Sequence, residues 1–319
     1  MSAPDAGAAA DRAEVLRLAA GTIARGSQSF AAAARLFEPE TRADAILLYA
    51  WCRHCDDVVD GQSLGHGGAA PPAAEALARL AELEEQTRAA FAGATPADPA
   101  FRALALVARR RRLPLALALH HLDGFRMDVE ERRYATLEDL LEYCHRVAGV
   151  VGTMMARIMG ASDPLVLTRA ADLGLAFQLT NIARDIVPDA TVGRVYLPED
   201  WLRQAGLSRE DLTDPEARER LARLARRLVE TAEPFYASAR IGIDALPRRS
   251  AWAIATALGV YRQIGLDVVA RGPGAWDGRV ATSGLAKLGH VAKGAGVALS
   301  RRAGAPPPRP AALWAHRWI

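Results

Sequence analysis

The sequence predicts an all-α protein, built as one large bundle of helices. Ala, Leu, Arg and Glu dominate the chain between its two ends, and these residues are among the better helix formers. Runs of β-branched residues with period-two alternation, which would indicate strands, are lacking. The chain has 319 residues and 50% of them are hydrophobic, which is enough for a core of ordinary size.

Apolar periodicity and capping residues locate the individual elements. The expected helices cover residues 11–25, 40–60, 73–92, 99–111, 115–130, 136–159, 164–187, 209–240, 247–270 and 284–300. Ser208, Thr136 and Asp163 are the expected N-caps, and Pro164 follows the last of them at the first helical position. No shift in composition divides the chain. We therefore expect one domain over 11–302, a disordered N-terminus at 1–10 and a flexible basic tail at 303–319.

Composition and charge exclude several classes of protein. With 24% charged residues and a net charge of +3, the chain is not of the disordered kind. No apolar run reaches the roughly 18 residues that a membrane span needs, and the acidic N-terminal segment is unlike a signal peptide. Three cysteines cannot form a disulfide framework, so we expect a reduced, cytoplasmic protein.

The C-terminal end of the chain is cationic. No acidic residue follows Asp277, whereas lysines and arginines continue to Arg317. Anionic lipid or nucleic acid could meet such a surface, but no nucleic-acid motif accompanies it, so we expect no nucleic-acid partner. Trp314 and Trp318 in the tail favour contact with a membrane surface, because tryptophan is enriched at membrane interfaces.

The most informative segment is the predicted helix at 40–60. Tyr49, Arg53, Asp56 and Asp60 recur at spacings of four, three and four, so they share one stripe of an otherwise apolar helix, with Asp57 beside them. Burying carboxylates without cations costs several kcal/mol each. One arginine cannot neutralise three aspartates, which implies a divalent metal or another cationic partner.

A second apolar helix carries a matching stripe. Gly174, Gln178, Asn181 and Asp185 lie on one side of it, and Asp189 follows Asp185 at the spacing that separates Asp56 from Asp60. Carboxylate oxygens without His or Cys at ligand spacing favour Mg²⁺ or Mn²⁺. Because Mg²⁺ completes its shell with water and phosphate oxygens, two such helices facing each other across a cavity are suited to bind a diphosphate. A single such pair is more often a solvated or salt-bridged face.

Other polar patterns have simpler interpretations. Cys52 and Cys55 form a C-x-x-C in mid-helix and are expected to pack structurally, since a zinc site or a redox pair needs a different context. Gly149 and Gly152 indicate either close helix packing or a tunnel for an apolar chain.

At these stripes the sequence resembles the head-to-head prenyl synthases, the squalene and phytoene synthase family, and is most similar to its bacterial phytoene branch. The segments that carry the resemblance are GSQSF (26–30), CRHCDDVVD (52–60), GFRMDVEERRYAT (124–136), YCHRVAGVVG (143–152), QLTNIARDIVPDATVGRVYLP (178–198), YRQIG (261–265) and AWDGRVATSGLAKL (275–288). The resemblance implies an isoprenoid-synthase bundle with a central apolar cavity.

The resemblance also implies roles for individual residues. Tyr143 would act near the reacting carbons, where a tyrosine assists rearrangement. The residues implied to hold Mg²⁺ are Asp56, Asp57, Asp60, Asp185, Asp189 and Asn181, and those implied to bind substrate are Ser27, Phe30, Arg53, Gln178, Asn181, Arg184, Arg194 and Tyr196. Pro188 stands where the family more often has an acidic residue. Because proline disfavours helix at the preceding residue, we expect the helix to end near Ile186 and to leave Asp189 on a turn.

The activity implied by the resemblance is condensation of two geranylgeranyl diphosphates to phytoene, with Mg²⁺ and without a nicotinamide cofactor. The same chemistry on farnesyl diphosphate, giving squalene or dehydrosqualene, is the nearest alternative. A non-catalytic helical relative is another, although every motif aspartate is present. We expect a cytoplasmic enzyme, with a peripheral position on the inner membrane or contact with downstream carotenoid enzymes as further partners.

Overall fold

A computed structural model describes residues 3–26, 33–61, 71–300 and 306–316. The helices are α1 (Ala3–Gly26), α3 (Pro39–Asp60), α4 (Ala73–Phe91), α5 (Pro99–Arg111), α6 (Leu115–Val129), α7 (Leu137–Cys144), the π-helical turn η1 (His145–Gly149), α8 (Val150–Ile158), α9 (Pro164–Thr191), α10 (Glu199–Gln204), the 3₁₀ turns η2 (Glu210–Thr213) and η3 (Pro215–Ala217), α11 (Arg218–Ile243), α12 (Arg248–Arg271), the 3₁₀ turn η4 (Gly272–Trp276) and α13 (Gly284–Leu299). No strand occurs in these ranges, which confirms the all-α class.

Local signals explain where most helices begin. Thr136 and Asp139 form a capping box at the start of α7, and the Asp163 side chain accepts from the Leu165 N–H at 2.7 Å ahead of Pro164. Gly61 ends α3 in the left-handed conformation, with φ 64°. These boundaries agree with the sequence-based expectation.

The predicted start of one helix and its predicted N-cap are wrong. The helix expected from residue 209 begins at Arg218, because Pro215 disfavours helix at Asp214 and the segment forms two 3₁₀ turns instead. Ser208 therefore caps no helix; its Oγ donates to the Asp211 carboxylate at 2.9 Å. The short helix α10 was not expected.

The disordered N-terminus expected at 1–10 and the flexible tail expected at 303–319 stay predictions, although the structure describes parts of both. Helix α1 begins at Ala3, in a segment rich in alanine, the best helix former. Within the tail, Arg309 and His316 bind the buried Asp172. The expected extended helix at 136–159 is continuous except for the π-helical turn η1.

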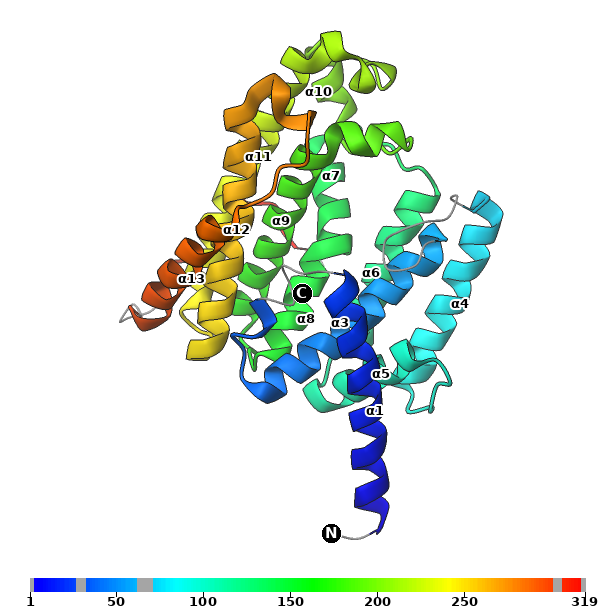
Figure 1. Cartoon of the computed structure of the whole chain (residues 1–319). Helices are drawn as coiled ribbons and strands as arrows, with labels where there is room; N and C mark the ends of the chain where they lie inside the picture. The colour runs from blue at the N-terminus through cyan, green and yellow to red at the C-terminus, as the bar shows by residue number, and fades with distance from the viewer. Residues whose placement is uncertain (1–2, 27–32, 62–70, 301–305, 317–319) are drawn as a thin grey trace. The chain divides into compact units, whose positions relative to one another are not determined.

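The chain divides into two compact units. Unit 1 contains the residues up to Glu130 together with Arg157–Gly160, and unit 2 contains Glu131–Ala156 and the residues from Ala161 onward. The single domain expected over 11–302 stays a prediction. Unit 1 is organised around α3, which packs against α1, α4, α5 and α6 (Figure 1). Its fully buried side chains include Trp51 and Phe101.

Unit 2 is organised around α9. This helix packs against α11, α12 and η1, and α13 lies along α12 (Figure 1). The approach of α9 to η1 and α8 is unusually close. A Cβ added at Gly174 would lie 2.3 Å from the Ala148 carbonyl oxygen in η1, and one added at Gly152 in α8 would lie 2.3 Å from the Ala170 carbonyl oxygen. Of the two interpretations of Gly152, the structure therefore supports close helix packing.

Within the described residues one stretch, Arg248–Trp276, is long and apolar enough by composition to cross a membrane. The expectation that no apolar run is long enough for a membrane span therefore does not hold for this stretch. A core helix passes the same test, and α12, which makes up most of this stretch, packs against α9, α11 and α13.

Candidate active site

The first group of predicted site residues lies on α3 in unit 1. Much of the rest of the helix is buried in the core, while Tyr49, Arg53, Asp56 and Asp60 are half-buried, as the stripe predicted. Arg53 Nη1 donates to Asp56 Oδ2 at 2.5 Å. Asp57, also half-buried, adjoins the stripe. The structure therefore brings one arginine and the carboxylates of the first motif to the same helix face.

Arg53 has binding capacity beyond this ion pair. Burial alone would lower the pKa of its guanidinium, but the charge of Asp56 and a hydrogen bond with Tyr49 outweigh it, and the pKa is raised. Its Nε is buried and has no hydrogen-bond partner in the part of the chain that the structure describes. A buried donor of this kind is costly unless a ligand or water satisfies it, which suits a residue that binds an anion.

The cysteines on the same helix are unsuited to metal or redox chemistry. Burial raises the pKa of Cys52 to about 12, and it raises the pKa of Cys55 well above the ordinary value. Because the thiolate is the form that binds metals and attacks disulfides, protonated thiols agree with a packing role.

The second group lies on α9 in unit 2. From Ala171 to Val187 the helix is buried apart from one half-buried stripe, which consists of Phe177, Gln178, Asn181, Arg184 and Asp185. Gly174, which the sequence placed on this stripe, is instead buried against η1.

Arg184 and Asp185 form a bidentate ion pair within this stripe. Arg184 Nε donates to Asp185 Oδ1 at 2.9 Å, and Nη2 donates to Oδ2. Burial would lower the pKa of Arg184, but the hydrogen bonds and charge of Asp185 raise it, with smaller contributions from Tyr261 and Asp189. The pair places an arginine and a carboxylate side by side on a largely buried helix.

The helix does not end before Pro188, so the expected turn at Asp189 is wrong. Helix α9 runs through Pro188 to Thr191. Proline removes only its own N–H, and this residue is exposed near the end of the helix, where the loss is tolerated. Asp189 therefore stays one helical turn after Asp185 on the same side, and the loop after it folds back so that the Arg194 N–H donates to the Asp189 carbonyl at 2.9 Å.

Asn181 supplies the clearest indication of a ligand-binding position. Its Oδ1 is buried and has no hydrogen-bond partner among the described residues, although it lies one turn from Asp185. Among the described residues no three His, Cys, Asp or Glu side chains come together as a metal cluster. An oxygen-donor set this sparse fits Mg²⁺, which keeps waters and binds substrate phosphates, better than a metal held wholly by protein.

Three tyrosines gather near the loop that follows α9. Tyr143 is buried and stacks on Tyr196, with ring centroids 4.9 Å apart and planes at 21°. Tyr134 joins them, 5.4 Å from Tyr143, and its carbonyl accepts from the Glu199 N–H at 2.8 Å, which ties α10 to this cluster. The sequence indicated Tyr143 and Tyr196 but not Tyr134.

A second aromatic pair adjoins the α9 stripe. Phe177 stacks on Tyr261 with centroids 4.2 Å apart. Tyr261 was overlooked, although it stands in the quoted YRQIG segment. Ser27 and Phe30, which were expected to bind substrate, lie outside the described residues.

Comparisons with known proteins identify the family of the chain. The family model described as squalene/phytoene synthase matches residues 23–286. The 15-cis-phytoene synthase of Pantoea ananas is 53% identical over 94% of this chain and 97% of that protein. The 15-cis-phytoene synthase of Enterobacter agglomerans is 54% identical over 91% of this chain and 98% of that protein.

Solved structures give the same result for the fold. A dehydrosqualene synthase in complex with ligand superposes with a TM-score of 0.79 at 26% identity, covering 91% of this chain and 98% of that one. A squalene synthase from Alicyclobacillus acidocaldarius gives a TM-score of 0.70 at 27% identity, covering 82% and 94%.

Proposed function

The chain belongs to the squalene/phytoene synthase family, and we propose that it joins two geranylgeranyl diphosphates head to head to make phytoene. It is an enzyme of the prenyltransferase type and acts in carotenoid biosynthesis. The reaction passes through a cyclopropyl diphosphate and releases diphosphate. The observation that carries the proposal is the pair of half-buried stripes on α3 and α9, because each combines carboxylates with an arginine on a mainly apolar helix.

Substrate diphosphates are the expected ligands of both stripes. Asp56, Asp57, Asp60, Asp185, Asp189 and Asn181 would hold Mg²⁺, or Mn²⁺ in its place. Bound Mg²⁺ would neutralise charge on the departing diphosphate. The unpartnered Asn181 Oδ1 and Arg53 Nε support this assignment, since a metal and an anion would satisfy an acceptor and a donor respectively.

Other residues would orient and protect the substrate chains. Gln178, Arg184 and Arg194 would bind the second diphosphate, and Ser27 with Phe30 would bind the first. The ring faces of Tyr143 and Tyr196 would lie near the reacting carbons, where an aromatic face stabilises a cation. An apolar cavity would exclude water from the carbocation.

The test is one assay with two substrates. Protein and Mg²⁺, without a nicotinamide cofactor, receive geranylgeranyl or farnesyl diphosphate, and hexane extracts are examined by mass and absorbance. A C40 conjugated triene from the first substrate alone is the expected result. A C30 product would change the substrate and keep the chemistry.

A separate measurement distinguishes an enzyme from a non-catalytic relative. We expect Mg²⁺ with inorganic diphosphate to raise the melting temperature of the wild-type protein, and Asp56→Ala and Asp185→Ala to reduce this shift. If neither variant changes diphosphate binding and no hydrocarbon forms, the aspartates are structural and the proposal is wrong.

A lipid surface is the partner we propose for the insoluble product's release, with the protein otherwise cytoplasmic. The tail tryptophan that suggested membrane contact is not the best candidate, because Trp314 packs on His145 with centroids 5.5 Å apart. Helix α13 is better suited. Leu285, Leu288 and Leu299 on its outer side are 84%, 66% and 77% exposed, and no acidic residue follows Asp277 in the sequence.

Pelleting with phosphatidylglycerol vesicles tests this surface. Leu285→Gln with Leu288→Gln should reduce pelleting, whereas Leu18→Gln, an exposed leucine on α1, should not. Equal pelleting of all three proteins would remove α13 from the proposal. A loss of self-association in the double variant, without a change in pelleting, would assign this face to a second copy of the chain.

A further inference from the structure

A single buried carboxylate holds residues 306–316 against unit 2. Asp172, on α9, is fully buried and takes part in four hydrogen bonds. Arg309 donates two of them, from Nε to Oδ2 at 2.9 Å and from Nη2 to Oδ1 at 2.8 Å. His316 Nε2 lies 2.7 Å from Oδ1, and Ser238 Oγ donates to Oδ2 at 2.5 Å. A carboxylate with this set of donors is fixed in one position.

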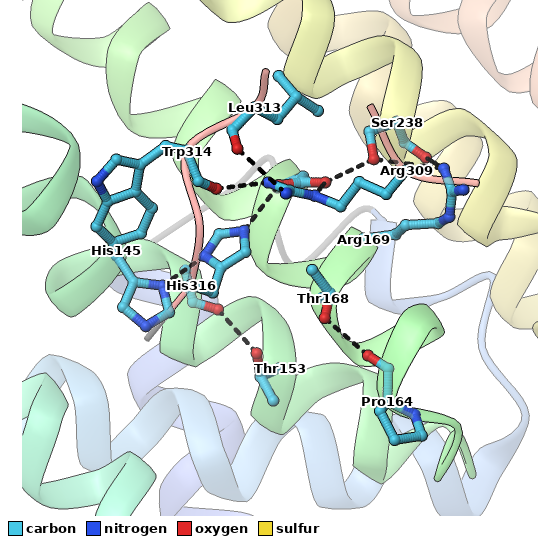
Figure 2. Close-up of polar contacts among 12 residues, drawn as sticks. His145, Thr153, Pro164, Thr168, Arg169, Ser238, Arg309, Leu313, Trp314 and His316 are labelled. Carbon is cyan, nitrogen blue, oxygen red and sulfur yellow. Dashed lines mark hydrogen bonds and ion pairs between the residues drawn. The ribbon is translucent and has the colours of Figure 1, made fainter. Parts of the chain in front are cut away.

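The same arginine also folds the segment that carries it (Figure 2). Arg309 Nη2 donates to the Trp314 carbonyl at 2.7 Å, so the chain turns back around the guanidinium. Arg169 Nη2 donates to the Pro307 carbonyl at 2.5 Å and fixes the start of the segment. The segment is therefore anchored along its length and not at one point.

The segment reaches a second helix through His145, the first residue of η1. His316 Nδ1 lies 3.1 Å from His145 Nδ1, and the Trp314 ring packs on His145. Neutral tautomers satisfy the chain of bonds, with His145 Nδ1–H donating to His316 and His316 Nε2–H donating to Asp172. Gly149 makes room for this ring, because a Cβ there would lie 2.6 Å from His145 Nδ1.

These anchors point away from the proposed active-site residues. Asp172 and Asn181 are nine residues apart on α9, which places them about 180° apart around the helix axis. Tyr143 and His145 are two residues apart, or about 200°. The segment thus contacts the face of α9 opposite Asn181 and the face of the α7–η1 helix opposite Tyr143.

We propose that residues 306–316 are a C-terminal brace, in which Arg309 and His316 are positioning residues. By holding Asp172 and His145 they fix α9 against η1, and so set Asn181 and Tyr143 for the reaction. The inference rests on the proposed function, since it assigns the brace to the condensation step.

The electrostatics of Asp172 agree with a permanent contact. Burial would raise its pKa, but hydrogen bonds from His316, Arg309 and Ser238 outweigh burial and lower the pKa. The carboxylate therefore stays ionised at neutral pH.

The experiment compares the wild-type chain with Arg309→Gln, Arg309→Lys and a chain that ends at Ala305. Arg223→Gln, at an exposed position on α11, is the matched control. For each protein kcat and KM for geranylgeranyl diphosphate are measured well below Tm, together with the Tm shift caused by Mg²⁺ and inorganic diphosphate. Displacement of about 1 Å can cost about 100-fold in rate, so we expect kcat to fall about 10- to 100-fold in Arg309→Gln and in the shortened chain.

The pattern across readouts separates positioning from stability. KM should change less than kcat, Arg309→Lys should recover part of kcat, and Arg223→Gln should match wild type. The proposal would be overturned if the shortened chain had full kcat and only a lower Tm. If the shortened chain does not fold, the same result in Arg309→Gln would overturn it. So would a rise in KM at unchanged kcat, which would place the segment at the substrate.

Hydrogen exchange distinguishes failure of the brace proposal from failure of the proposed function. If the wild-type chain makes no hydrocarbon, the proposed function fails, and amide exchange over His145–Thr153 then decides the brace. Faster exchange there in Arg309→Gln than in Arg223→Gln supports it, and equal exchange contradicts it.

Discussion

Replacing Gly174 with alanine should push α9 away from the π-helical turn η1. A Cβ at this position would lie 2.3 Å from the Ala148 carbonyl oxygen and 2.7 Å from the Gly149 Cα. Ordinary contact begins at 3.4 Å, so the two backbones must move apart by about 1 Å. Both clashing atoms belong to the backbone, and no change of rotamer can relieve them.

The expected loss of stability follows from two opposing contributions. Overpacking of this kind costs about 1–3 kcal/mol, and replacing a helical glycine with alanine returns up to about 1 kcal/mol. We therefore expect Gly174→Ala to lower the free energy of unfolding by about 1–2 kcal/mol. Gly152→Ala should behave alike, since its Cβ would lie 2.3 Å from the Ala170 carbonyl oxygen.

Gly289→Ala on α13 is the matched control. Nothing lies within 4 Å of a Cβ at that position, so only the gain in helix propensity remains and stability should rise by up to about 1 kcal/mol. Urea unfolding at unchanged m-value measures all three variants. If Gly174→Ala is as stable as wild type, or shifts in the same direction as Gly289→Ala, the close contact of α9 with η1 is not as described.

Four further predictions concern α3 and α9. Pro188→Ala should raise the free energy of unfolding by about 1–3 kcal/mol in thermal melts, because alanine restores a donor for the Arg184 carbonyl inside α9; a lower Tm would contradict this. Cys52, whose pKa burial raises to about 12, should react with iodoacetamide at pH 8 about a thousandfold more slowly folded than in urea, and rapid labelling of the folded chain would refute it. The pKa of Cys52 is higher in the folded than in the unfolded chain, so the protonated thiol stabilises the fold fully below pH 9 and progressively less as the pH rises toward 12. Cys52→Ala should therefore reduce the dependence of the free energy of unfolding on pH between 9 and 12. Arg184→Gln should weaken diphosphate binding in the thermal-shift assay and raise KM, since it leaves Asp185 without its bidentate partner; wild-type values would exclude Arg184 from the site.

The sequence was sufficient for features that repeat at helical spacing. The stripes on α3 and α9 could be predicted because each polar residue recurs every three or four positions against an apolar background, and the structure leaves those same residues half-buried. The prediction that the helix ends before Pro188 was wrong. The backbone preference of a residue before proline does not determine whether the last turn of a long helix can accommodate the proline. Packing of the preceding turns on α11 and η1 fixes the helix direction before the proline is reached.

The C-terminal segment could not have been predicted from its own composition. A run of prolines followed by small residues indicates disorder, and nothing local marks Arg309 or His316 as different from other cations. Their partner Asp172 lies 137 and 144 positions earlier in the chain, inside a helix where a lone aspartate has no periodic companion. Such a pairing is set by the tertiary structure, and a sequence pattern that repeats every three or four residues carries no information about it.

Helix α9 combines these features in one element. Asp172 binds the C-terminal segment, Gly174 allows backbone contact with η1, and the stripe from Gln178 to Asp189 carries the proposed ligands. A side chain at Gly174 would force the backbones apart and Asp172 is held by four hydrogen bonds, so the anchored end of the helix is fixed by contacts that admit little adjustment. The polar stripe begins about one turn later, where a rigid helix transmits any displacement of the anchors to Asn181. Changes at Asp172 and Gly174 should therefore alter the reaction rate without touching a residue that binds substrate.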